Sequence, residues 1–181
     1  MVADALEGER TIGMAMMRPG WERAGANPPI FAVGGAGRIV DSETLPDGRY
    51  NIVLEGEFRY RVLDESPPAP YRVGRVEVIP SVPFSDPSRE AAAVAETSAL
   101  FTALSKAMEL APLPEERLSA ERLASELALR LRYDAAELQA LLKTDSVSDR
   151  FDALLSRMRE WDGRIRFLAP FRSKDLDAGR N

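Results

Sequence analysis

The stretch LPDGRYNIVL, residues 45–54, decides the fold of the first half of this chain. Its opening residues supply a proline that fixes φ and an Asp-Gly pair that tolerates positive φ, as a tight turn requires. After the turn, Tyr50, Ile52 and Leu54 occupy alternate positions, which is the period of a half-buried strand. Because residues 37–41 before the turn also favour a strand, we expect a β-hairpin.

Further strands extend the hairpin into a sheet. Residues 58–62 alternate in the same way after a glycine, and residues 11–17 and 71–79 also favour strands. The apolar residues of the last of these segments change face half-way, so we expect a β-bulge at Gly74. The predicted result is a small, strongly curled barrel, because closure removes the exposed edges that an open sheet has to protect.

The composition of the 181-residue chain changes near Pro83. Residues 1–83 hold 10 of the 12 glycines and 9 of the 13 prolines, whereas residues 84–181 are rich in Ala, Leu, Glu and Arg. Glycine and proline punctuate short strands, and the second mixture favours helices. The sequence therefore predicts an α+β protein, with a β-rich barrel in 1–83, an α-helical bundle in 84–171 and a flexible tail in 172–181.

The second half carries recognisable helix signals. Asp86 followed by Pro87 predicts a helix start, and Asp134 with Glu137 predicts a capping box. A second capping box is expected at Ser146, before an apolar stripe with helical spacing. That stripe consists of Val147, Phe151, Leu154, Met158 and Trp161.

The residue inventory argues against an enzyme. The chain has no histidine and no cysteine, so imidazole bases, thiolate nucleophiles and the usual zinc ligands are excluded. Its lysines, Lys106, Lys143 and Lys174, do not follow glycine and have no serine three positions before them, which excludes a P-loop and a Ser-x-x-Lys nucleophile. The acidic pairs at 55/57 and 115/116 are interpreted as structural. No catalytic residue, metal or cofactor is expected.

Charge and hydropathy narrow the class of partner. With 24 basic and 29 acidic residues the net charge is −5, which disfavours nucleic acid. The alternative is an RNA-binding module, whose basic patch would be built from Arg59, Arg61, Arg72 and Arg75. Neither an apolar run long enough for a membrane span nor a signal peptide is visible, so a cytoplasmic protein is expected.

A cluster of methionine and tryptophan favours recognition of apolar polypeptide. Residues 14–21 hold three methionines and Trp21 near a Pro-Gly turn, and such side chains suit adaptable apolar contacts. We expect Met14 and Met16 to line the core. The candidate peptide-binding residues are then Trp21, Met17 and Phe31.

Several motifs, taken in order, resemble the N-terminal substrate-binding domain of Lon proteases, which also circulates as a small stand-alone protein. The resemblance covers most of residues 1–80 and, more weakly, the helices. It rests on IGMA at 12–15, RPGWE at 18–22, GRI at 37–39, LPDGRYNI at 45–52, YRV at 71–73, LLKTD at 141–145, RF at 150–151 and LL at 154–155.

This resemblance implies a PUA-like pseudo-barrel, a helical bundle and a non-catalytic role in binding protein substrates, because the family's ATPase and protease activities reside in other domains. Family members usually begin with a Pro- and Leu-rich strand segment ahead of the helix that residues 1–6 resemble. We therefore expect the first strands of the barrel to be missing here. An unpaired barrel edge would favour self-association, alongside unfolded or partner polypeptides as ligands and with no membrane partner.

Overall fold

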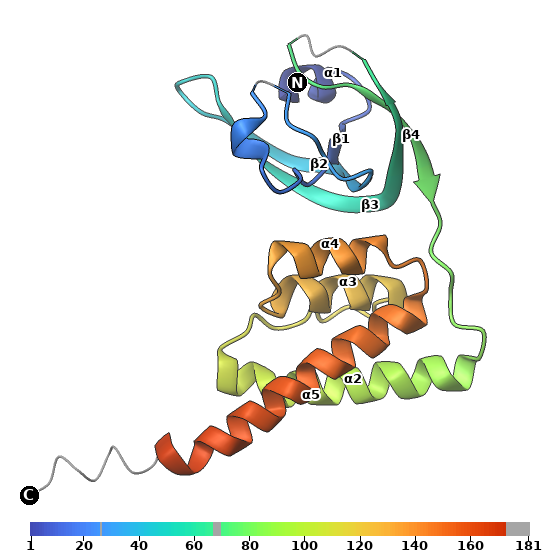
Figure 1. Cartoon of the computed structure of the whole chain (residues 1–181), viewed down its shortest axis with the longest axis vertical. Coiled ribbons are helices and arrows are strands. Elements are labelled where there is room, and N and C mark those ends of the chain that lie inside the picture. The colour runs from blue at the N-terminus through green and yellow to red at the C-terminus, as the bar shows by residue number, and fades with distance from the viewer. Residues whose placement is uncertain (26, 67–69, 173–181) are drawn as a thin grey trace, which may run out of the picture. The chain divides into compact units, whose positions relative to one another are not determined.

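A computed structural model describes residues 1–25, 27–66 and 70–172, and it divides into two compact units, Met1–Pro80 and Ser81–Asn181. The first unit contains the sheet and the second contains the long helices (Figure 1). This is the predicted α+β class. The tail expected from residue 172 onward lies almost wholly outside the described residues.

The first unit, hereafter the sheet unit, is built on one antiparallel sheet with the strand order β1-β2-β3-β4. The predicted hairpin joins β2 and β3: the Leu45 N–H donates to the Arg49 carbonyl at 2.8 Å, and Gly48 adopts a φ of 82°. The elements of the sheet unit are α1 (Val2–Glu7), β1 (Thr11–Met14), the 3₁₀ helix η1 (Trp21–Arg23), β2 (Val33–Thr44), β3 (Tyr50–Glu65) and β4 (Gly74–Ile79).

The sheet curls but does not close into a barrel. Figure 1 shows β3 bent along its length, and β1 and β4 are the two edges of the described sheet. The expected bulge at Gly74 is wrong, because β4 begins at this glycine and the shift in register falls in β3, between Val62 and Asp64. Two more shifts, between Ala36 and Gly37 and between Ile39 and Asp41, interrupt the pairing of β2 with β3. Bulges bend a strand and increase its twist, which accounts for the curl of a sheet with only four strands.

Tyr60 is the centre of the small core of the sheet unit. Its ring is buried and lies against the backbone of Gly13 and Gly34, where an added Cβ would come within 2.9 and 2.6 Å of the hydroxyl oxygen. Glycine is needed there because the tyrosine ring occupies the space of a side chain. Ile12 and Ile39 are also buried.

The second unit, hereafter the helical unit, has a larger core. Its helices are α2 (Pro87–Met108), α3 (Ala120–Arg130), α4 (Ala135–Lys143) and α5 (Val147–Arg172). The predicted start of α2 is confirmed, since the Asp86 carboxylate accepts from the Ser88 N–H, and so is the capping box at Asp134. All five residues of the predicted α5 stripe are buried: Val147, Phe151, Leu154, Met158 and Trp161.

A buried arginine ties the start of the helical unit to its helices. The guanidinium of Arg150 donates to the Thr144 carbonyl at 2.7 Å and to the Ser81 hydroxyl at 2.8 Å, and the same hydroxyl donates to the Glu121 carboxylate. Val82 pairs with Ser146 in a short parallel bridge. These bonds hold the segment that enters the helical unit against α3 and α5.

Candidate polypeptide-binding surface

The methionine- and tryptophan-rich segment forms one arm of a short two-stranded ribbon in the sheet unit. Met17 pairs with Ile30. On either side of this pair, the Phe31 N–H donates to the Met16 carbonyl and the Arg18 N–H donates to the Pro29 carbonyl, both at 2.8 Å. In an antiparallel pair, successive residues point to opposite faces. Met17 and Ile30 therefore share one face, and Met16 and Phe31 share the other.

Trp21 lies where the first arm of the ribbon ends. Gly20 takes a left-handed φ of 86°, and the chain then enters η1 with the Trp21 N–H donating to the Arg18 carbonyl at 3.2 Å. The indole is 43% exposed, and Met17, four residues earlier in the chain, is 38% exposed. An exposed indole is a large apolar surface with a single polar group, which suits contact with another polypeptide.

Phe31 lies on the other face of the ribbon, under an arginine. The Arg18 guanidinium is 5.8 Å from the centre of the Phe31 ring, and its Nε donates to the Ile30 carbonyl at 2.9 Å. This cation–π contact covers part of the ring. The structure therefore places Met17 and Phe31 on the ribbon, pointing to opposite faces, and Trp21 just beyond the end of its first arm.

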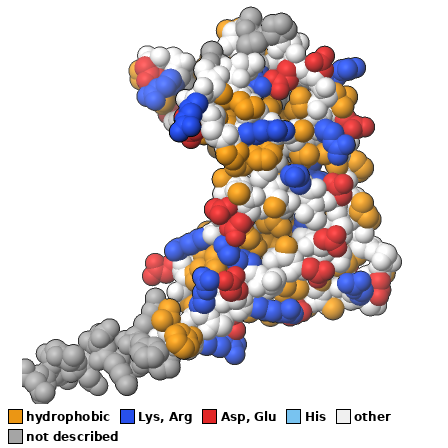
Figure 2. Space-filling view, viewed as in Figure 1, with side chains coloured by type: hydrophobic (Ala, Val, Ile, Leu, Met, Phe, Trp, Pro, Cys, Tyr) orange, Lys and Arg blue, Asp and Glu red, His pale blue; other side chains and the backbone are white. Residues whose placement is uncertain are grey.

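Met14 corrects the expectation that it lines the core. Its side chain is 61% exposed, whereas Met16 is half-buried. Met14 is the last residue of the edge strand β1, and its register partner is Gly35, which offers no side chain to pack against it. Sequence reasoning missed this apolar surface because alternation alone does not report what stands opposite. Figure 2 shows hydrophobic side chains beside arginines on the visible face of the sheet unit.

The four arginines of the RNA-binding alternative do not form one exposed patch. Arg59 is buried and donates to the Pro80 carbonyl at 3.2 Å. Arg72 pairs with the Glu65 carboxylate and donates to the Pro28 carbonyl at 2.6 Å. Only Arg61 and Arg75 are exposed to the extent that phosphate binding needs, and two cations supply little of the usual electrostatic attraction.

In each acidic pair weighed as catalytic, one residue lies beside an arginine. Glu57 accepts from the Arg38 Nε at 2.7 Å, and Glu116 lies 3.8 Å from the Arg122 guanidinium. Within the described part of the chain, no group of three or more acidic side chains could hold a metal ion. None of the described helices combines the length and apolar character that a bilayer span requires.

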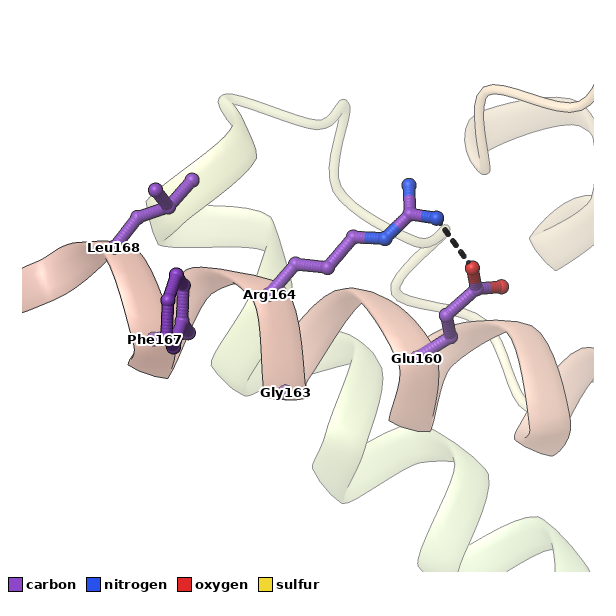
Figure 3. A pocket seen from close by; sticks show the side chains of 5 residues that line it. All are labelled: Glu160, Gly163, Arg164, Phe167 and Leu168. Carbon is purple, nitrogen blue, oxygen red and sulfur yellow. Dashed lines mark hydrogen bonds and ion pairs between the residues drawn. The ribbon is translucent and has the colours of Figure 1, made fainter.

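The last turns of α5 form a shallow depression that Figure 3 shows from close by. Its walls are Phe167, Leu168, Gly163 and an ion pair in which the Arg164 guanidinium donates to Glu160 at 2.6 Å. Every one of these residues belongs to a single helix, so the depression has no opposite wall to enclose a ligand. Phe167 is 71% exposed.

An arginine stacked between two aromatic rings is the most unusual electrostatic feature of the helical unit. The Arg157 guanidinium lies 5.3 Å from the ring centres of both Tyr133 and Trp161 and contacts Glu137 at 2.8 Å. Burial raises the pKa of Tyr133 to about 12, and the nearby guanidinium offsets this only in part. Its hydroxyl has no hydrogen-bond partner among the described residues, so the arrangement resembles packing rather than proton transfer.

Known proteins match both the sequence and the shape of this chain. A family model for the ATP-dependent protease La (LON) substrate-binding domain matches residues 1–160. The Lon protease of Dictyoglomus thermophilum is 35% identical over 79 residues, and that of Anaeromyxobacter dehalogenans is 27% identical over 79 residues. Each match covers 44% of this chain but only 10% and 9% of the respective protease.

Two solved structures share the fold. The N-terminal domain of Mycobacterium avium complex Lon protease superposes with a TM-score of 0.58 at 16% identity, covering 82% of this chain and 90% of that one. The Lon N-terminal domain protein from Xanthomonas campestris gives a TM-score of 0.50 at 21% identity, covering 81% and 88%. At these identities the likeness concerns the fold alone.

Proposed function

Since the chain belongs to the family of Lon protease substrate-binding domains, we propose that it binds unfolded or partner polypeptides through the apolar surface around Trp21 and does not cleave them. A role in substrate binding fits the family, whose N-terminal domain is a non-catalytic module. The observation that carries the assignment of the site is the exposure of both Trp21 and Met17.

The chemistry of the ribbon fits an apolar segment that arrives in extended form. The indole and the thioether supply adaptable apolar area. Backbone hydrogen bonds fix the ribbon beneath them, so little ordering is needed when a ligand binds. Phe31 stays a predicted contact, on the opposite face from Met17.

Binding can be measured with fluorescein-labelled casein, which is an unfolded polypeptide, by fluorescence polarisation. We expect the native chain to bind, and Trp21→Ala to weaken binding at least about tenfold, the loss typical of a buried aromatic anchor. Leu129→Ala removes an exposed leucine from α3 of the helical unit and should bind like the native chain. Equal affinity of Trp21→Ala and the native chain would contradict the proposed site. No binding by either protein would contradict the proposed function.

The proposed lack of cleavage is tested in the same mixture. The labelled casein should stay intact on a denaturing gel after prolonged incubation, with or without ATP and Mg²⁺. The chain contains neither a histidine nor a cysteine. In each acidic pair one residue, Glu57 or Glu116, lies beside an arginine. Fragments that appear only with the purified chain would contradict the proposal.

A further inference from the structure

The outer edge of β4 has a definite pattern of backbone groups. The Val62 N–H donates to the Ala32 carbonyl at 2.8 Å, so Val62 of β3 turns its backbone toward β2. Its neighbour Arg61 must then turn toward β4, because successive residues of a strand alternate in direction. Arg61 is paired with Glu77, and Glu77 therefore points its backbone inward, to β3.

A second hydrogen bond, on the other side of the bulge in β3, indicates the same alternation of backbone direction along β4. The Ser66 N–H donates to the Val73 carbonyl at 2.9 Å, so every second residue after Val73 also points to β3. Val76 and Val78 consequently point their N–H and C=O groups away from the sheet. No hydrogen bond to these two residues from another described part of the chain is present.

The side chains along this edge are exposed as well. Val76 is 40% and Val78 is 54% exposed, and both lie on the face of the sheet that carries Tyr60 and Val62. A strand with free amides and uncovered β-branched side chains is a template for pairing with another strand.

We propose that β4 pairs with β4 of a second copy of this chain, antiparallel, about a two-fold axis at Val76. In this register Val76 stands opposite Val76 of the second copy, with their outward backbone groups exchanging hydrogen bonds. Arg75 then stands opposite Glu77 of the second copy, and the symmetry repeats this pair on the other side of the axis.

Charge complementarity selects the second copy as the occupant. Within one chain Arg75 stands opposite Asp64 in the strand register, and Glu77 stands opposite Arg61. Joining the two edges produces a row across four strands in which Asp64, Arg75, the other copy's Glu77 and the other copy's Arg61 alternate in sign. Opposite charges directly across a strand pair are stabilising, and like charges are destabilising. The opposite face brings the two Val76 side chains together between the two Val62 side chains.

The charges also disfavour the neighbouring register. An axis at Glu77 would allow the same outward groups to pair, with Val76 opposite Val78, but it would place the two Glu77 carboxylates opposite each other. A generic apolar strand from another protein would offer Arg75 and Glu77 no opposite charge on the outer side of β4. The pattern Arg-Val-Glu is self-complementary only when centred on its valine.

The first test uses charge reversal and light scattering on the full chain. The native chain should have the mass of two copies. Arg75→Glu and Glu77→Arg should each weaken the dimer at least about tenfold, because each reverses two symmetric contacts. An equimolar mixture of these variants should dimerise again, since each then meets its complement. Circular dichroism melts establish that each variant is folded, and Phe167→Ser, on α5, should leave the dimer intact.

The second test fixes the register with disulfides, in a chain that contains no cysteine of its own. Val76→Cys should cross-link under mild oxidation, because directly opposed Cα atoms lie about 5.5 Å apart, inside the range a disulfide spans. Val78→Cys is the matched control on the same face, and its two copies would be separated by about 13 Å along the strands. A monomeric native chain, a mixture of the charge variants that stays monomeric, or equal cross-linking of both cysteine variants would overturn the proposal.

Discussion

The two units of this protein differ in how far they bury their apolar side chains. The helical unit buries Phe151, Leu154 and Met158 completely within its own helices. The sheet unit buries Tyr60 and a few aliphatic side chains but leaves its edge valines and Trp21 exposed. Burial of apolar area is the main favourable term in folding. The helical unit is therefore stabilised from within, whereas the sheet unit leaves exposed the apolar side chains on which the two proposals rest.

The largest expected effect concerns the core of the helical unit. Phe151→Ala should lower the free energy of unfolding by about 3–5 kcal/mol, because it removes a fully buried ring and leaves a cavity. Urea denaturation followed by far-ultraviolet circular dichroism measures this change. Phe167→Ala, on the exposed end of the same helix, should change it by less than about 0.5 kcal/mol. Similar losses of unfolding free energy in the two variants would contradict the view that α5 is packed at Phe151 and open at Phe167.

A smaller effect is expected from filling a glycine position in the sheet unit. Gly34→Ala should cost about 1–3 kcal/mol, because its Cβ would meet the Tyr60 ring and the Met14 carbonyl oxygen at 2.6 Å. Gly35→Ala is the matched control, since nothing lies within 4 Å of its Cβ. Hydrogen exchange read by mass spectrometry should show faster exchange in residues 1–80 for Gly34→Ala alone. Faster exchange in the helical unit as well would mean that the two units do not unfold separately.

The smallest effect at neutral pH is expected at Tyr133. Its pKa in the folded chain is raised to about 12 from the ordinary value of 10.0, so its contribution to stability is full below pH 10. That contribution is lost as the pH rises from about 10 to about 12, because the unfolded chain ionises first. The urea midpoint of the helical unit should fall more steeply over this range in the native chain than in Tyr133→Phe.

At pH 7 the same variant should match the native chain or exceed its stability slightly, because the lost hydroxyl has no partner among the described residues. Parallel pH profiles for the two proteins would show that the hydroxyl is solvated in solution. Burial also raises the pKa of Tyr60. Tyr60 belongs to the sheet unit, so its ionisation should not change the circular dichroism signal of the helices.

Local signals in the sequence were sufficient for the helices and the hairpin. The Asp134 capping box and the apolar stripe from Val147 to Trp161 were predicted because each depends on residues three or four positions apart. The β2–β3 turn followed from its Asp-Gly pair. Each of these features is decided by near neighbours in the chain.

The register of the sheet could not be predicted in this way. The shift at Val62 and the exposure of Met14 depend on which residue stands opposite, and that partner is distant in sequence. The same reason explains the candidate site. Trp21, Met17 and Phe31 were identified by residue type, but only the pairing of Met17 with Ile30 shows that they do not share one face.

The continuation of α5 past its buried stripe has a mechanical consequence. The helix runs from Val147 to Arg172, whereas the last buried side chain among those described is Trp161. A continuous helix fixes the direction in which the exposed side chains of Phe167 and Leu168 point. One residue inserted after Gly163 would rotate these two side chains by about 100° about the helix axis and advance them by about 1.5 Å, whereas four would leave a net rotation of only about 40°. The length of α5, rather than its surface chemistry, would then decide the direction in which these two side chains point.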